Sequence, residues 1–217
     1  MGATRDILVP TPHGEGRLVI AAARGAVATL LLGHGAGAGV DSPDLEALAT
    51  HLPRHGVTVV RFEQPWVRAG RRLATAGPTL DTAFVAGANR LRTRTPLIVG
   101  GRSAGARTAV RQARGLAAVG VLALAFPLHP PRRPDKTRLP ELLGTRVPVL
   151  VVQGERDALG RPEEFPDDVT LVTVPGADHS FAVPARGPLT HDEALGLVVE
   201  TALEWIVRDV VGNARWG

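Results

Sequence analysis

The chain alternates between short, continuously apolar runs and longer stretches in which apolar residues recur every three to four positions. Apolar runs of four to eight residues that end at turn-forming residues are typical of strands. They predict strands at residues 5–10, 16–23, 27–32, 57–62, 97–100, 119–126, 147–153 and 169–174. A turn cluster at residues 12–16, rich in Pro and Gly, joins the first two strands as a hairpin.

The stretches with helical spacing lie between the later strands and after the last one. They predict helices at residues 44–55, 79–94, 107–114 and 190–211. A proline-rich segment at residues 130–134 excludes regular structure there. Because the strands alternate with helices and are apolar throughout, the pattern predicts an α/β fold with a mostly parallel, doubly wound sheet covered on both faces. In such a sheet, functional residues gather at the carboxyl ends of the strands.

The length and composition of the chain predict one globular domain. The chain has 217 residues, of which 44% are hydrophobic and 21% charged, and no stretch is typical of an interdomain linker. We therefore expect residues 1–217 to form a single domain. The absence of cysteine excludes disulfides, thiolate metal sites and a cysteine nucleophile. We expect neither a metal nor a cofactor.

The ends and the charge of the chain indicate its compartment and partners. The N-terminal residues lack the apolar core of a signal peptide, and the longest apolar run, at 116–126, is far shorter than a membrane span. We expect a cytoplasmic protein without a membrane partner. Lys136 is the only lysine among 25 basic residues, and the net charge is +4. This arginine excess is typical of genomic composition bias, and no aromatic residues are interleaved with it, so nucleic-acid binding is disfavoured.

The segment Gly101-Arg102-Ser103-Ala104-Gly105 stands between a predicted strand and a predicted helix. A Gly-x-Ser-x-Gly sequence in that context is typical of a nucleophile elbow, in which the serine sits on a strained turn. Glycines two residues before and two after the serine let strand and helix approach without Cβ clashes. Ser103 is therefore the predicted nucleophile.

A serine nucleophile needs a histidine base, and the histidine needs an acid that fixes its tautomer. Asp157 follows the predicted strand at 147–153, and His179 follows the next strand. With Ser103, these residues stand in the order Ser, Asp, His at three carboxyl ends. Glu155 and Asp178 are alternative acids, of which Asp178 is the weaker because adjacent side chains diverge.

The remaining histidines are predicted to have other roles or positions. His129 is a further candidate for lining the mouth of the site, and we interpret His34 as support for its own loop. His191 follows a Thr190 N-cap, with Glu193 completing a capping box. The hairpin turn and the first predicted helix contain the others, His13, His51 and His55.

The tetrahedral intermediate of acyl transfer needs two N–H donors. Ala104, next to Ser103 and at the start of a helix, is predicted to supply one. Ala36, in the glycine-rich loop at residues 33–39, is predicted to supply the other. That loop lacks the Gly-Lys-Ser/Thr ending of a phosphate-binding P-loop.

Over almost its whole length the chain resembles the α/β-hydrolase superfamily. More narrowly it is similar to the dienelactone-hydrolase-like branch that includes testis-expressed protein 30 and a subunit of the non-specific-lethal histone-acetylation complex. Three segments carry this resemblance: Gly33-His34-Gly35-Ala36-Gly37-Ala38, Arg61-Phe62-Glu63-Gln64-Pro65-Trp66 and Gly100-Gly101-Arg102-Ser103-Ala104-Gly105-Ala106-Arg107.

The resemblance implies the Ser-Asp-His assignment and an eight-stranded sheet with one antiparallel strand, but no particular substrate. Dienelactone hydrolase itself uses cysteine, which argues against dienelactone here. Ala106 stands where this branch often has glycine.

The residues together predict a serine hydrolase without a large lid that acts on a small ester, thioester or related acyl substrate. Peptidase or amidase activity is an alternative reaction. A non-catalytic interaction module is the alternative from another class, because the resemblance includes a complex subunit. An anionic substrate would suit the arginines near the predicted site, which are Arg68, Arg71, Arg72 and Arg102. The sequence leaves the oligomeric state open.

Overall fold

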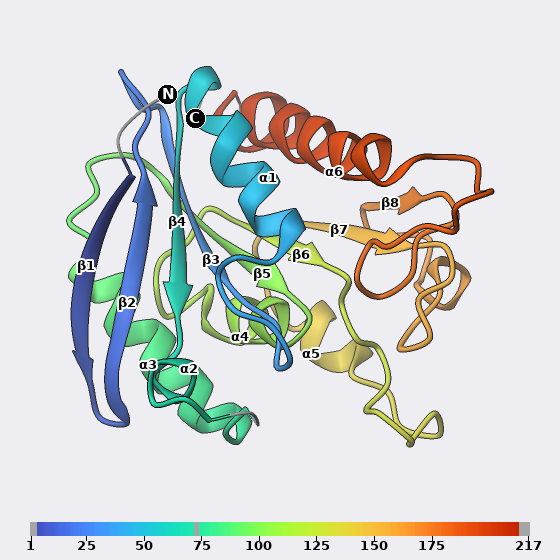
Figure 1. Cartoon of the computed structure of the whole chain (residues 1–217), viewed down its shortest axis with the longest axis horizontal. Helices are drawn as coiled ribbons and strands as arrows, with labels where there is room; N and C mark the ends of the chain where they lie inside the picture. Colours follow the sequence, from blue (N-terminus) through green and yellow to red (C-terminus); the bar gives the residue numbers. More distant parts are fainter. Residues whose placement is uncertain (1–3, 72–73, 213–217) are drawn as a thin grey trace.

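The computed structural model describes residues 4–71 and 74–212, and its centre is one eight-stranded sheet (Figure 1). The strand order is β1-β2-β4-β3-β5-β6-β7-β8. The strands are β1 (Thr4–Thr11), β2 (Gly14–Ala21), β3 (Ala28–Gly33), β4 (Val57–Glu63), β5 (Leu97–Arg102), β6 (Gly120–Leu124), β7 (Val149–Gly154) and β8 (Leu171–Val174). Every predicted strand is present, within a few residues of its predicted bounds.

Strand β2 alone runs opposite to the others. It pairs antiparallel with β1 on one side and with β4 on the other, whereas the pairs from β4 through β8 are parallel. The sheet therefore has the one antiparallel strand that the family resemblance implies. The carboxyl ends of the parallel strands, β5, β7 and β8 among them, all lie at one edge of the sheet.

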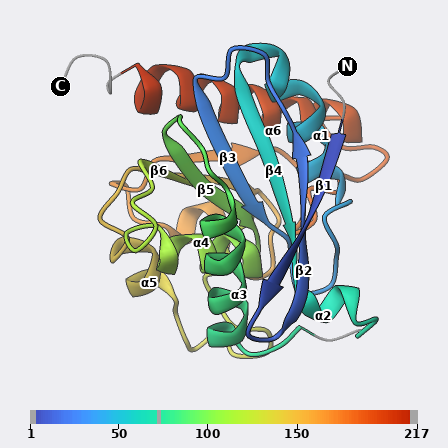
Figure 2. The same cartoon turned by 90° about the vertical axis from the view of Figure 1, so that its left-hand side faces the viewer.

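Helices cover both faces of the sheet (Figures 1 and 2). Helices α1 (Pro43–His51) and α6 (His191–Trp205) pack on one face. Helices α3 (Gly77–Arg90), α4 (Ala104–Gln112) and α5 (Leu139–Leu143) pack on the other. The short helix α2 (Pro65–Arg68) follows the carboxyl end of β4.

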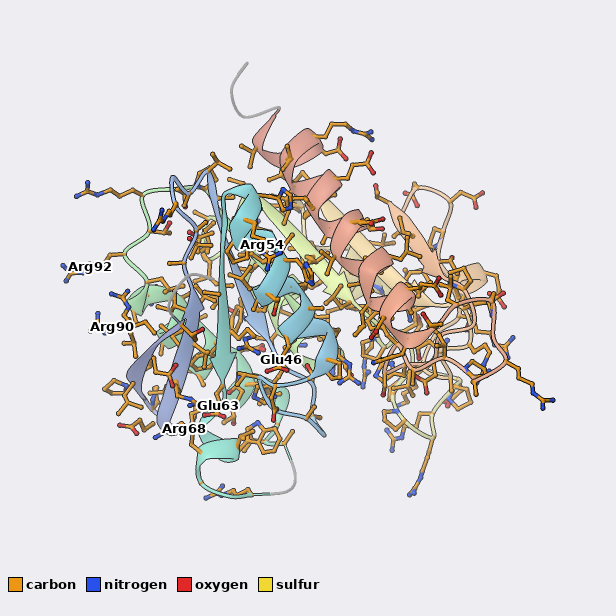
Figure 3. The ribbon with its side chains drawn as sticks, turned by 45° about the horizontal axis from the view of Figure 1, so that its top comes forward. Glu46, Arg54, Glu63, Arg68, Arg90 and Arg92 are labelled. Carbon is orange, nitrogen blue, oxygen red and sulfur yellow. The ribbon has the colours of Figure 1, made fainter. Side chains whose placement is uncertain are left out.

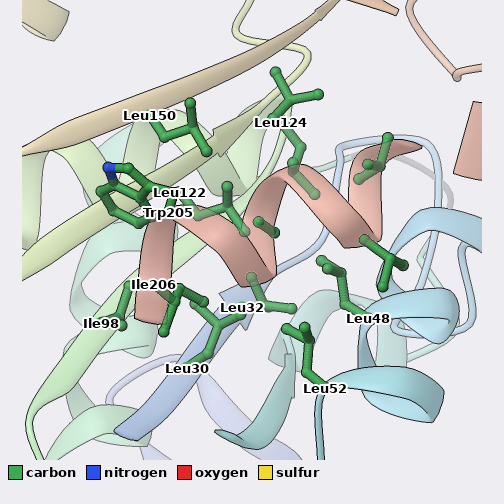
Figure 4. Close-up of a cluster of buried hydrophobic side chains, with 14 of the residues drawn as sticks. Leu30, Leu32, Leu48, Leu52, Ile98, Leu122, Leu124, Leu150, Trp205 and Ile206 are labelled. Atoms are coloured by element: carbon green, nitrogen blue, oxygen red, sulfur yellow. The ribbon is translucent and has the colours of Figure 1, made fainter. Parts of the chain in front are cut away.

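Side chains of successive residues in β3 point to opposite faces, and both faces are buried. Leu30 and Leu32 join the cluster under α1 and α6, which Figure 4 shows in close-up, while Leu31 joins the cluster under α3 and α4. Trp205, the last residue of α6, and Ile206, which follows it, also belong to the first cluster. This double burial explains why the strands are continuously apolar in sequence.

Several helices differ from their predicted bounds for local reasons. The first predicted helix ends at His51 and continues as a 3₁₀ turn, η1 (Leu52–His55), which contains Pro53 and stops at the left-handed Gly56. Helix α3 ends at Arg90 rather than residue 94, because the Thr93 hydroxyl bonds the backbone of Thr95 and competes with the helix.

The later helices differ as well. Helix α4 begins at Ala104, three residues earlier than predicted, directly after Ser103. The last predicted helix ends at Trp205 and continues as a π-helical turn, η3 (Ile206–Val211). The segment 130–134 has no regular structure, as predicted, but α2, α5 and a 3₁₀ turn, η2 (Pro162–Glu164), were not predicted. These three pieces are too short to show a helical period in the sequence.

Candidate active site

Ser103 occupies a strained turn between β5 and α4. Its φ of 53° and ψ of −110° are values that side-chain-bearing residues rarely adopt. A Cβ atom on Gly101 or on Gly105 would overlap with the backbone of Gly33 at the end of β3. Glycine at both positions therefore lets β3, β5 and α4 meet, and the turn that results leaves Ser103 partly exposed above the sheet.

His179 lies in the loop after β8, and both of its ring nitrogens have partners. Nε2 is 2.9 Å from Ser103 Oγ, and Nδ1 is 2.7 Å from Asp157 Oδ2. With the proton on Nδ1, His179 donates to Asp157 and accepts from the Ser103 hydroxyl. The structure thus brings together the three residues that the sequence predicts, from the ends of β5, β7 and β8.

Asp157 is fully buried, and three donors surround its carboxylate. Leu159 N–H donates to Oδ1 at 2.8 Å, and Gln153 Nε2 donates at 2.8 Å to Oδ2, the oxygen that also faces His179. These donors fix the orientation of the carboxylate toward His179.

Gln153, the penultimate residue of β7, is a site residue that the sequence analysis missed. Its amide also bonds the backbone N–H and C=O of Phe126 and the C=O of Gly160, and it is fully buried. A single amide side chain therefore ties the loop of Asp157 to the end of β6. The signal in the sequence was one polar residue closing an otherwise apolar strand.

The two alternative acids have other roles in the structure. The Asp178 carboxylate accepts from the N–H groups of Ser180 and Ala182 and so shapes the loop that carries His179. The Glu155 carboxylate accepts from Gly176 N–H, at the turn after β8. Neither carboxylate is hydrogen-bonded to His179.

Ala36 and Ala104 line one small pocket beside Ser103. Its free volume of about 10 Å³ is the size of one water molecule or one oxygen atom. Ala104 is the first residue of α4, so its N–H has no partner inside the helix. No hydrogen bond from Ala36 N–H occurs in the part of the chain that the structure describes. The two alanines thus line the same pocket, and neither of their N–H groups has a hydrogen-bond partner among the described residues.

His34 holds the loop that carries Ala36. Its Nδ1 donates to Gly35 O at 2.8 Å, and its Nε2 accepts from Gln64 N–H at 3.1 Å. Burial lowers the pKa of His34, although Gly35 O and the charge of Glu63 act in the opposite direction. The neutral ring that results links the end of β3 to the end of β4, in keeping with the supporting role predicted for it.

The other candidate histidine, His129, is hydrogen-bonded to groups outside the triad. Its ring bonds Lys136 O and Glu164, both at 2.7 Å, and these bonds raise its pKa. His191 begins α6, where Thr190 and Glu193 form the predicted capping box.

The four arginines of the predicted substrate site have different surroundings. Arg68 pairs with Glu15 at 2.8 Å and with Glu63 at 3.7 Å (Figure 3). Arg71 lines a separate pocket next to Trp66, and Arg72 lies outside the described residues.

Arg102 is mostly buried, with 11% of its side chain exposed, and lies close to Ser103. Its Nη2 donates to Ser180 Oγ at 3.0 Å, and its Nε is 3.7 Å from the buried Asp44. Burial raises the pKa of Asp44, and the charge of Arg102 opposes that shift. Arg102 thus connects the elbow to the loop of His179 and to the start of α1.

A strained serine after a parallel strand, hydrogen-bonded to a histidine after the last strand, defines an α/β-hydrolase type of site. Residues 26–207 match the family model described as an alpha/beta hydrolase domain, and the chain belongs to that family. Membership of this family supports a hydrolase.

Solved structures show the same fold. An α/β serine hydrolase without a lid from Xanthomonas campestris matches with a TM-score of 0.69 at 20% identity, over 93% of this chain and 94% of that one. A serine hydrolase homologue from Coxiella burnetii gives 0.72 at 20% identity, over 93% and 98%. A dienelactone hydrolase from Anabaena variabilis gives 0.68 at 21% identity, over 95% and 97%. At these identities the likeness concerns the fold.

None of the helices in the described part of the chain combines the length and the apolar character needed to span a bilayer.

Proposed function

We propose that this chain is a serine hydrolase that cleaves a small ester, thioester or related acyl substrate through an acyl-serine intermediate. The observation that carries the proposal is the hydrogen-bond chain from Ser103 through His179 to Asp157, with distances of 2.9 and 2.7 Å. A serine in an ordinary glycine turn would have no such base.

The geometry supports a two-step reaction. The Ser103 hydroxyl passes its proton to His179 Nε2 as Oγ bonds to the substrate carbonyl carbon. The N–H groups of Ala36 and Ala104 stabilise the oxyanion, and Asp157 stabilises the imidazolium. The tetrahedral intermediate then collapses: the bond to the leaving group breaks, and His179 returns the proton to that group. Water repeats the sequence on the acyl-serine and releases the acid.

Within the family, we place the chain in the dienelactone-hydrolase-like branch, on the three motifs described above. A serine in place of that enzyme's cysteine argues against dienelactone as the substrate. The proposed substrate class is therefore a carboxylic ester or thioester, with the oxygen or sulfur of its leaving group protonated by His179.

Labelling with a fluorophosphonate tests this proposal. We expect one label per chain at neutral pH, located on Ser103 and visible as an intact-mass increase. The label should disappear in Ser103→Ala and form far more slowly in His179→Ala. It should also fade as the pH falls, because an imidazolium cannot accept the serine proton. Folded protein that stays unlabelled, or equal labelling of Ser42 or Ser180, would point instead to a non-catalytic interaction module.

A further inference from the structure

The side chain of Arg102 lies between three segments of the chain at the proposed site. Its Nη2 donates to Ser180 Oγ at 3.0 Å, and its Nη1 lies against the backbone of Gly35, where a Cβ atom would be 3.5 Å away. Its Nε is 3.7 Å from the carboxylate of Asp44, in the first turn of α1. One guanidinium therefore contacts the loop after β8, the loop after β3 and the start of α1.

Arg102 and two of its contacts each stand next to a residue of the proposed catalytic machinery. Arg102 precedes the nucleophile, Ser180 follows the base, and Gly35 precedes one oxyanion donor. These neighbours are, in the same order, Ser103, His179 and Ala36. The contact with Ser180 is a charge-assisted hydrogen bond, which fixes both a distance and a direction. It is therefore the contact through which Arg102 can place the base.

The loop that carries His179 is closed by hydrogen bonds of its own. Asp178 Oδ1 accepts from the N–H groups of Ser180 and Ala182 at 2.7 and 3.0 Å, and Asp178 N–H donates to Ala182 O at 2.9 Å. Phe181, between these residues, is fully buried. These contacts hold Ser180 in a fixed relation to the imidazole, so a bond at Ser180 also sets where the imidazole lies.

Asp44 keeps the guanidinium of Arg102 inside the protein. The Asp44 side chain is almost completely buried, and Arg102 is its only ion-pair partner among the described residues. Either charge buried without the other would lose its hydration without compensation, which is costly. The pair therefore disfavours a conformation in which Arg102 turns out to solvent. It also leaves Arg102 without a free charge for a substrate anion.

We infer that Arg102 is a positioning residue for the proposed hydrolysis. Through Ser180 it holds the ring of His179 at the nucleophile, and Asp44 retains its guanidinium. This inference rests on the proposed function, because it concerns the base of the same reaction. It gives Arg102 a role different from the substrate binding that the sequence predicts. An arginine that binds substrate acts on KM, whereas one that positions the base acts on kcat.

The rate of fluorophosphonate labelling at Ser103, followed by intact mass, tests this role. Ser180→Ala removes the hydroxyl that accepts from Arg102. It should slow labelling about tenfold, because a small misplacement of the base slows the reaction steeply. Ser180→Thr keeps a hydroxyl and should label nearly as fast as the parent protein. Ser180 is exposed, so both variants should fold, and urea unfolding checks this.

Two double variants show whether Arg102 acts through this route. Arg102→Met should slow labelling about 10- to 100-fold, and adding Ser180→Ala should cause little further loss, because the bond is already absent. In a His179→Ala background, Arg102→Met should leave the slow residual labelling unchanged, since no imidazole remains to be positioned. An arginine that merely supported the shape of the elbow would slow this residual reaction as well.

Variants of Asp44 separate positioning from stability. Asp44→Asn should slow labelling, because the guanidinium loses the charge that retains it. The double variant Asp44→Asn/Arg102→Met removes both buried charges, so it should be more stable in urea than Arg102→Met alone. It should nevertheless label no faster than Arg102→Met, because the bond to Ser180 is still missing.

A neutral and an anionic ester of equal acyl length separate positioning from substrate binding. With ethyl butanoate and monoethyl succinate, Arg102→Met should lower kcat by a similar factor for both and change KM by less than about twofold. Arg107→Met is the matched control, because Arg107 lies in the first turn of α4 and pairs with Glu141 of α5 instead. It should leave kcat and KM near the parent values.

Three results would overturn the inference. They are parent-rate labelling of folded Ser180→Ala, slower residual labelling when Arg102→Met is added to His179→Ala, and a rise in KM for the anionic ester alone in Arg102→Met. A parent protein that does not label at Ser103 would instead defeat the proposed function itself, so the two failures are distinguishable.

Discussion

The backbone of Gly105, in the first turn of α4, lies directly against that of Gly33 at the end of β3, so closely that a Cβ on Gly105 would overlap with the Gly33 carbonyl. Gly33 leads into the loop of Ala36, and Gly105 follows Ala104. The contact therefore sets the distance between the two N–H groups that we propose as oxyanion donors.

Replacing Gly105 by alanine should push these two backbones apart. We expect Gly105→Ala to lower the free energy of unfolding by about 1–3 kcal/mol, the usual cost of overpacking, and to slow labelling of Ser103. Urea unfolding and intact-mass labelling measure the two effects. Gly196→Ala is the matched control, because Gly196 lies inside α6 with open space around it. Gly196→Ala should raise the free energy of unfolding by about 0.5–1 kcal/mol. A Gly105→Ala protein that matches the parent protein in stability and in labelling rate would refute the role of the contact.

The second prediction concerns the acidic residue that orients His179. Asp157→Asn should reduce kcat by several orders of magnitude while the protein stays folded, because the amide favours the wrong tautomer of His179. Asp178→Asn should have a much smaller effect on kcat, since Asp178 bonds only backbone N–H groups of its own loop. Steady-state hydrolysis of a small ester, with circular dichroism as the check of folding, compares the two. A larger loss of kcat in Asp178→Asn than in Asp157→Asn would identify Asp178 as the acid that orients His179.

The third prediction concerns the stability of the protein in acid. Because burial lowers the pKa of His34, the unfolded chain binds a proton at this residue at a higher pH than the folded chain does. An unfolded histidine titrates near a pH of about 6.5, so the stability contribution of neutral His34 is complete above that pH. It is lost progressively as the pH falls from there toward the lower folded pKa.

Urea unfolding at a series of pH values between about 7.5 and 5 measures this loss. His34→Gln should flatten the decline, because a glutamine oxygen can still accept from Gln64 N–H but takes up no proton. His55→Gln, at an exposed position in η1, should leave the slope as it is in the parent protein. An identical slope in His34→Gln would show that other groups cause the acid sensitivity.

The fourth prediction concerns acyl chain length. Between β6 and β7, where lipases insert a helical lid, the only α-helix in this chain is α5, with five residues. Residues 125–148, all of which the structure describes, therefore contain no large helical lid. We expect kcat/KM to be higher for short acyl esters than for long-chain ones, measured over a series from acetate to palmitate. Faster hydrolysis of long chains, or activation at a lipid interface, would contradict this expectation.

The sequence by itself determined the strands, the main helices and the positions of Ser103, Asp157 and His179 at strand ends. Each of these features has a local cause. Burial on both faces makes strands continuously apolar, the Gly101 and Gly105 spacing reflects one sharp turn, and residues that follow parallel strands share one edge of the sheet.

Only the tertiary structure decided which side chains meet. Asp157, rather than Glu155 or Asp178, lies 2.7 Å from His179. Gln153 holds the Asp157 carboxylate, and Arg68 is paired whereas Arg71 lines a pocket. These outcomes depend on distances of a few ångströms between segments far apart in the chain. A hydrogen bond forms only within a narrow range of donor–acceptor distances and angles. A pattern of residue types therefore fixes the end of the sheet at which such groups gather but not their partners.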